Sequence, residues 1–145
     1  MNVQVKVFPE MNASVTGGFN DKQHKHLIVR ADISWCPQEE DLNKVSDWVR
    51  GLIKKIEMKL LAGPYTTYVS DLGNKGMTSV AIIETSHIAL HIWDETNPGL
   101  MQLDVYSCAD FNPQNIFDEV DRVFKTVKME YKFLDREKEL VEVNI

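Results

Sequence analysis

The sequence predicts an α+β domain, built as a two-layer sandwich in which an antiparallel sheet carries two main helices on one face. Several segments of alternating polarity follow one another through short turns, which favours antiparallel pairing. Two further segments repeat apolar residues at steps of three and four, as amphipathic helices do. Each helix has one apolar stripe, so both can cover the same sheet face. The length of 145 residues suits a single domain over 1–145.

The first predicted strands lie before residue 35. Residues 3–8 alternate apolar and polar side chains and predict a half-buried strand. Residues 11–25 are polar and contain Gly17-Gly18, which indicates a loop. Residues 26–34 then predict a second strand.

The first predicted helix follows this strand. Pro37 opens it, and the acidic residues 39–41 fall in its first turn, where the helix dipole favours negative charge. We expect Gly63-Pro64 to end it. Its apolar stripe consists of Leu42, Val45, Trp48, Val49, Leu52, Ile53, Ile56 and Leu60.

Four strands are predicted between the helices, over 65–70, 77–83, 88–93 and 101–107, with turns at 73–76 and 96–99. Asn112-Pro113 provides a cap and a proline at the first position of the second helix. The chain after this helix is strand-like at 131–133 and 140–143. The stripe of the second helix consists of Ile116, Phe117, Val120, Val123, Phe124 and Val127.

Composition narrows the classes of partner. The net charge of -6 argues against nucleic acid or an anionic membrane surface, but allows a cationic small molecule. Apolar runs are too short for a membrane span, and no signal peptide is recognisable. With two cysteines, Cys36 and Cys108, we expect a reduced, cytoplasmic setting. His24-Lys25-His26 lacks a further ligand at a convincing spacing, so we expect no metal site.

Residues with chemical potential are concentrated between Thr78 and Cys108. On the strand that follows Ser86, alternation places His91 and Trp93 on the face opposite to the apolar residues. Because ends of neighbouring strands meet in a meander, we expect Ser86, His91, Thr78 and Cys108 to share one small site. Each also has a structural explanation, such as a turn for Ser86 or a small buried side chain for Cys108.

Two segments resemble the proenzymes of bacterial and archaeal S-adenosylmethionine decarboxylases. One runs Ser86-His87-Ile88-Ala89-Leu90-His91-Ile92-Trp93-Asp94-Glu95, and the other runs Leu103-Asp104-Val105-Tyr106-Ser107-Cys108. The family has Ser-His-x-x-x-His-x-Trp-Pro-Glu and then apolar-Asp-apolar-aromatic-x-Cys. Gly76-Met77-Thr78-Ser79 and His26-Leu27 are similar to its earlier strands. The resemblance is specific from Gly76 to Cys108.

This resemblance implies a cofactor made from the chain itself. In the family the serine hydroxyl attacks the preceding carbonyl, and elimination of the resulting ester splits the chain and leaves a pyruvoyl group. Such a ketone forms a Schiff base with the substrate amine and accepts the charge left by decarboxylation, which protein side chains cannot do. Here the scission falls between Thr85 and Ser86, and the pyruvoyl group derives from Ser86.

The resemblance also assigns roles to individual residues. His91 matches the histidine that helps to remove the serine α-proton, and Cys108 matches the acid that protonates the product. Thr78 stands where the family has a serine that assists processing. Glu95 matches an acid near the bound nucleoside, and Trp93 lies where an aromatic ring can stack on adenine. The family commonly dimerises, so we expect a homodimer.

Two departures from the family pattern bear on function. Thr85 replaces the usual Glu, and its β-branch crowds the carbonyl under attack, so we expect slow processing. Trp93-Asp94-Glu95 replaces Trp-Pro-Glu on the substrate side. S-adenosylmethionine, for spermidine synthesis, is the first-choice substrate. Arginine or ornithine is the alternative, as is a non-cleaving homologue that binds a nucleoside or a protein partner.

Overall fold

The computed structural model describes residues 23–145. The strand predicted at 3–8 and most of the loop predicted at 11–25 lie outside these residues. The described elements are β1 (Lys25–Ile33), the 3-10 turn η1 (Glu39–Asp41), α1 (Leu42–Lys55), β2 (Leu60–Val69), β3 (Gly76–Ile83), β4 (Ser86–Trp93), β5 (Gly99–Ser107), α2 (Pro113–Phe124), β6 (Thr126–Asp135) and β7 (Val141–Glu142).

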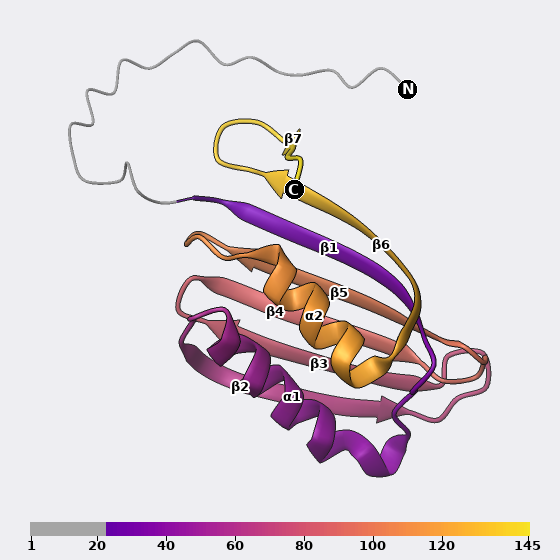
Figure 1. The fold of residues 1–145 in the computed structure, drawn as a ribbon. Coiled ribbons are helices and arrows are strands. Elements are labelled where there is room, and N and C mark those ends of the chain that lie inside the picture. The colour runs from indigo at the N-terminus through magenta and orange to yellow at the C-terminus, as the bar shows by residue number, and fades with distance from the viewer. Residues whose placement is uncertain (1–22) are drawn as a thin grey trace, which may run out of the picture.

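The strands of residues 23–145 form one antiparallel sheet in the order β2-β3-β4-β5-β1-β6-β7. Both helices lie across the same face of this sheet (Figure 1). The predicted α+β sandwich is therefore confirmed. β4, which carries most of the candidate site, is a central strand between β3 and β5.

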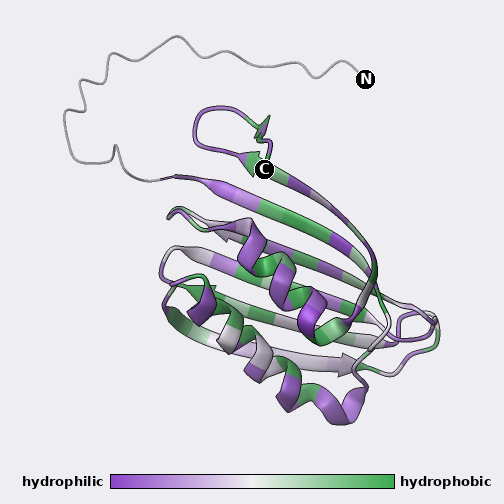
Figure 2. Cartoon of the chain, in the orientation of Figure 1, coloured by the Kyte–Doolittle hydropathy of each residue, from purple (hydrophilic) through white to green (hydrophobic). Residues whose placement is uncertain are grey.

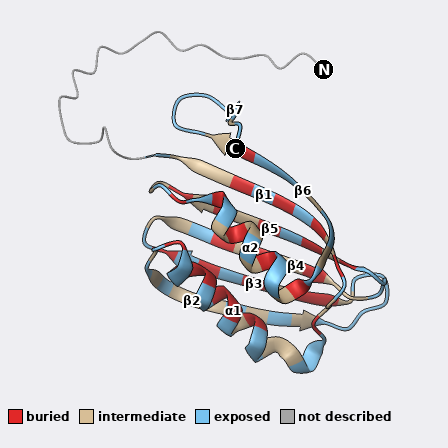
Figure 3. Ribbon diagram, in the orientation of Figure 1, coloured by how far each residue is buried: buried red, intermediate tan, exposed pale blue. Residues whose placement is uncertain are grey.

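The core fills the space between the helices and the sheet. Hydrophobic and hydrophilic residues alternate along both helices (Figure 2), and the buried positions recur along the helices and strands (Figure 3). In β4, Ile88, Leu90 and Ile92 are buried beneath the helices, as the alternation predicts. Their neighbours on the strand face the helix-free side of the sheet.

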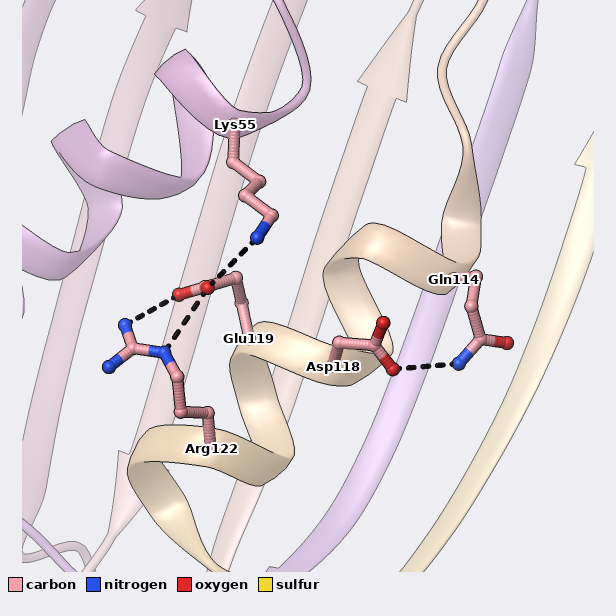
Figure 4. A network of polar contacts seen from close by, with 5 residues as sticks. All are labelled: Lys55, Gln114, Asp118, Glu119 and Arg122. Carbon is pink, nitrogen blue, oxygen red and sulfur yellow. Dashed lines mark hydrogen bonds and ion pairs between the residues drawn. The ribbon is translucent and has the colours of Figure 1, made fainter.

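The helices are also linked by charge. Glu119 of α2 accepts hydrogen bonds from Arg122, with Nη2 to Oε2 at 2.8 Å, and its Oε1 lies 3.6 Å from Nζ of Lys55 at the end of α1 (Figure 4). One turn earlier in α2, the side-chain amide of Gln114 donates a hydrogen bond to the Asp118 carboxylate. The side chain of Glu119 is only 12% exposed, so these cations compensate a carboxylate that is largely withdrawn from water.

The prediction that Gly63-Pro64 ends the first helix is wrong. The regular helix starts at Leu42 after η1 and ends at Lys55, while Leu60 already belongs to β2. The backbone N–H of Met58 donates to Ile53 O, and Glu57 adopts a left-handed φ of 59°. This closes the helix as a Schellman motif, which usually has glycine at the left-handed position.

Gly63 and Pro64 lie within the edge strand β2, where the register shifts. An edge strand tolerates a proline because one of its sides makes no ladder hydrogen bonds. Val127, assigned to the second helical stripe, is likewise in β6 and is exposed. α2 ends at Phe124, and Lys125 takes a left-handed conformation. Its predicted start is confirmed, since the Asn112 side chain accepts from Gln114 N.

Candidate active site

Ser86 lies immediately after the tight turn that joins β3 to β4. Glu84 and Thr85 form the turn, and the N–H of Glu84 donates to Lys59 O at 2.8 Å. Ser86 has a φ of 145°, a region that residues with a β-carbon avoid. Such a conformation costs on the order of 1–3 kcal/mol and persists only where the surroundings enforce it. The peptide before Ser86 is therefore held in a strained geometry.

The carbonyl of Thr85 has a defined partner. The backbone N–H of Cys108 donates to Thr85 O at 2.8 Å, just beyond the point where Ser86 pairs with Ser107 across β4 and β5. An N–H donor at this distance polarises the carbonyl and stabilises negative charge that develops on its oxygen. The structure thus brings Ser86 and Cys108 together at one end of the sheet.

Thr78 and His91 form a second group. They face each other across β3 and β4, and Thr78 Oγ1 lies 3.0 Å from His91 Nδ1. The His91 ring stacks on Trp93 with centroids 6.0 Å apart. These side chains line a small cavity of about 170 Å³ on the helix-free face, together with Asn74 and Val69.

The four residues expected to share one small site do not come together within a single chain. Ser86 and His91 are five positions apart on the same extended strand, which separates them by about 17 Å. The strand pairing that joins Thr78 to His91 places both far from the β3–β4 turn. The chain therefore carries two separate groups of candidate residues: Ser86 with Cys108, and Thr78 with His91.

Glu95 and Trp93 contact the β2–β3 turn. The Glu95 carboxylate accepts from the N–H of Lys75 at 2.8 Å and from that of Gly73 at 3.1 Å. Trp93 Nε1 donates to Asn74 Oδ1 at 3.1 Å. Glu95 thus has a structural task that the sequence did not reveal, and its role toward a substrate stays a prediction.

Two titratable groups near Trp93 were also not anticipated. The Tyr68 hydroxyl donates to Asp94 Oδ2 at 2.6 Å, and this bond, followed by burial, raises the pKa of Tyr68 to about 12. Burial, with a smaller contribution from Asp94, raises the pKa of the Cys36 thiol to about 11. Both groups therefore stay protonated near neutral pH. Asp94 replaces the proline of the family pattern, so its acceptor role has no counterpart there.

A polar cluster on the helix-free face was missed as well. His26 Nε2 lies 2.8 Å from Asp104 Oδ1, and Arg136 lies over the ring of Tyr106 at 4.3 Å. Within residues 23–145, no group of three or more His, Cys, Asp or Glu side chains has the arrangement of a metal site. Neither helix of this part of the chain is long and apolar enough to cross a membrane.

Comparison with known proteins identifies the family. The model of the S-adenosylmethionine decarboxylase family matches residues 25–137. The chain therefore belongs to the S-adenosylmethionine decarboxylase family. This confirms the resemblance drawn from the segments around Ser86 and Cys108.

Individual relatives are similar over part of the chain. The S-adenosylmethionine decarboxylase proenzymes of Pyrobaculum islandicum and Methanococcus maripaludis are 41% and 32% identical over 64 and 63 residues. These alignments cover 43% of this chain and 50% of each relative, so the matched part spans about half their length. The crystal structure of the adenosylmethionine decarboxylase of Aquifex aeolicus superposes with a TM-score of 0.58 at 18% identity, covering 86% of this chain and 98% of that chain. This likeness supports the fold.

Proposed function

We propose that this chain is an S-adenosylmethionine decarboxylase, made as a proenzyme that cleaves itself between Thr85 and Ser86. Its cofactor is a pyruvoyl group derived from Ser86, and its product feeds spermidine synthesis in the cytoplasm. The observation that carries the proposal is the strained Ser86 next to a carbonyl that accepts the Cys108 N–H, in a chain of this family. Strain in the scissile peptide lowers the barrier to its rearrangement.

Cleavage proceeds through an ester. The Ser86 hydroxyl oxygen attacks the Thr85 carbonyl carbon, the Thr85–Ser86 C–N bond breaks, and the Ser86 nitrogen leaves as an amine after taking up the hydroxyl proton. The Cys108 N–H stabilises the oxyanion formed on Thr85 O during the attack. Loss of the Ser86 α-proton then expels Thr85 as a carboxylate. Water next displaces the Ser86 nitrogen, which leaves as ammonia, and its oxygen becomes the ketone oxygen of the pyruvoyl group. Residues 1–85 and 86–145 become separate polypeptides.

When present, the pyruvoyl ketone supplies the electron sink that decarboxylation of an amino acid requires. The backbone of Cys108 lies beside the scissile bond, so its thiol is available near the new N-terminus of residues 86–145. We assign to this thiol the protonation of the product carbon. Trp93, stacked on His91 at the rim of the small cavity, provides an aromatic surface for adenine.

His91 reaches Ser86 only if two copies associate, because the two residues lie about 17 Å apart within one chain. We propose a homodimer in which the helix-free sheet faces pack together. A twofold axis between the sheets and perpendicular to β4 reverses the strand, so that Ser86 of one copy lies opposite His91 of the partner subunit. Thr78, bonded to His91, then completes the processing site.

The helix-free face has the composition that such packing needs. Ile28, Val80 and Ile82 are 39%, 36% and 48% exposed on it, although they lie on interior strands of the sheet. Ala89 pairs with Val80 and adds a small, partly exposed neighbour. Val80, Ile82 and Ala89 are neighbours on β3 and β4, whereas Asp104 of β5 lies between Ala89 and Ile28. Exposed apolar residues grouped on a sheet face are typical of an interaction surface.

Release of carbon dioxide from carboxyl-labelled substrates tests the proposal. We expect release from S-adenosylmethionine and none from Ser86→Ala, because that variant cannot form the ketone. Release from arginine or ornithine instead would reassign the substrate while keeping the chemistry. If S-adenosylmethionine raises the melting temperature of the purified protein but no labelled gas appears with any substrate, the chain is a binding homologue and the enzymatic proposal fails.

A further inference from the structure

Ser107 is one of two fully buried serines among the described residues, and it contacts the residue at the proposed scission. Its hydroxyl donates to Thr85 Oγ1 at 2.9 Å, and the N–H of Ala109 donates to Ser107 Oγ at 3.0 Å. Thr85 Oγ1 in turn donates to Met58 Sδ at 3.1 Å, and Ser107 Oγ lies 3.7 Å from the same sulfur. The hydrogen bonds therefore link the end of β5 through Thr85 to the chain just after α1.

This chain of hydrogen bonds fixes the conformation of Thr85. A threonine side chain has few favourable rotamers, and in some of them the methyl group crowds the adjacent carbonyl. The thioether of Met58 is a weak acceptor, so the Thr85 hydroxyl alone is poorly held by it. Ser107 supplies the second bond, and its own oxygen is anchored by the backbone at Ala109.

The carbonyl of Thr85 is held by the same segment, through the N–H of Cys108. Three consecutive residues, 107–109, thus fix the Thr85 side chain and carbonyl together. We propose that Ser107 is a positioning residue for self-cleavage: it selects the Thr85 rotamer that leaves the carbonyl carbon open to the Ser86 hydroxyl. The inference rests on the proposed function and deepens it, because it explains how a β-branched residue is accommodated before Ser86.

The test compares two substitutions, each of which removes the hydroxyl of a buried serine. Ser107→Ala removes the bond to Thr85, whereas Ser79→Ala removes a bond of 2.9 Å to Thr66 on the β2 side of the sheet. The measurement is the first-order rate at which full-length protein converts to the two fragments, followed by intact mass. We expect Ser107→Ala to slow cleavage about tenfold and Ser79→Ala to change it less than about twofold, with similar losses of melting temperature.

A double-mutant cycle separates positioning from general destabilisation. If Ser107 acts through Thr85, then adding Ser107→Ala to Thr85→Val slows cleavage no further than the slower single variant. Ser107→Thr, which keeps the hydroxyl, should restore most of the rate. If the two substitutions slow cleavage by factors that multiply in the double variant, the positioning role is overturned. The same holds if Ser107→Ala cleaves at the wild-type rate. The proposed function stays intact in both cases.

Met58→Leu covers the case in which Ser107→Ala does not fold. It keeps the volume and removes the sulfur acceptor at the other end of the chain of bonds. We expect cleavage about two- to threefold slower than in the wild type. An unchanged rate in this variant would count against the inference. Absence of cleavage in the wild-type protein would instead refute the proposed function itself, and the positioning role with it.

Discussion

At the scale of the residue, the positive φ of Ser86 and the polarised carbonyl of Thr85 are the most informative features. Neither is visible in the sequence, because the φ of Ser86 is set at the tight β3–β4 turn and the partner of Thr85 O comes from the end of β5, which is remote in sequence. The residue types alone are compatible with an ordinary turn. In the folded sheet the Thr85–Ser86 peptide is strained at Ser86, and its carbonyl accepts a hydrogen bond from the Cys108 N–H.

Glu95 shows that a residue matched to a family position can have a second role. Its carboxylate holds the β2–β3 turn through the amides of Gly73 and Lys75. We expect Glu95→Ala to speed hydrogen exchange of these two amides about fivefold or more, because each loses its acceptor. The exchange rates are measured by NMR, with Glu139→Ala as the control. Unchanged exchange of both amides would contradict the structural role.

At the scale of the element, the sequence predicts what depends on local spacing. The alternation in β4 and the Asn112-Pro113 start of α2 are confirmed because each follows from neighbouring residues. The end of α1 was misplaced because Glu57 occupies a left-handed position where glycine is the usual signal. Strand order was not predictable, since β1 and β6 are remote in sequence and pair only in the folded sheet.

The pairing of the helices predicts a pH effect. The Arg122 hydrogen bond, with Lys55 adding to it, holds the pKa of the Glu119 carboxyl below its ordinary value of 4.5. Because the pKa is lower in the folded state than in the unfolded state, the ion pairs stabilise the fold fully at pH values above 4.5. Their contribution is lost as the pH falls through the lower, folded-state pKa.

Glu119→Gln should therefore reduce the free energy of unfolding by about 0.5 kcal/mol at pH 7. Below the folded-state pKa the difference from the wild type should vanish. Urea unfolding at a series of pH values measures this, with Glu40→Gln in η1 as the control. A difference that stays constant down to acidic pH would show that packing, and not charge, explains the loss.

At the scale of the whole molecule, the sheet has one face beneath helices and one without them (Figure 1). The sequence anticipated this asymmetry from two helical stripes and one sheet. It did not anticipate that the candidate residues divide into two groups along β4, because the predicted strand began at residue 88, whereas β4 already includes Ser86. The proposed association through the helix-free face would bring the two groups together in one site.

Val80→Glu tests this association. It introduces a charge at an exposed apolar position on an interior strand of the helix-free face, which the proposed dimer would bury, so we expect the dimer to dissociate and cleavage to slow. Leu72→Glu, in the β2–β3 turn at 89% exposure, is the control and should remain dimeric. Light scattering gives the mass of each variant. A wild-type monomer at micromolar concentration, or a Val80→Glu dimer that cleaves normally, would contradict the arrangement.

The intact mass of the purified protein after prolonged incubation tests most directly whether the Thr85–Ser86 bond breaks. We expect two polypeptides, residues 1–85 ending in a free Thr85 carboxylate and residues 86–145 beginning with a pyruvoyl group in place of Ser86. Ser86→Ala should remain one full-length chain. A wild-type protein that stays at its full-length mass, indistinguishable in this respect from Ser86→Ala, would show that the Thr85–Ser86 bond does not break.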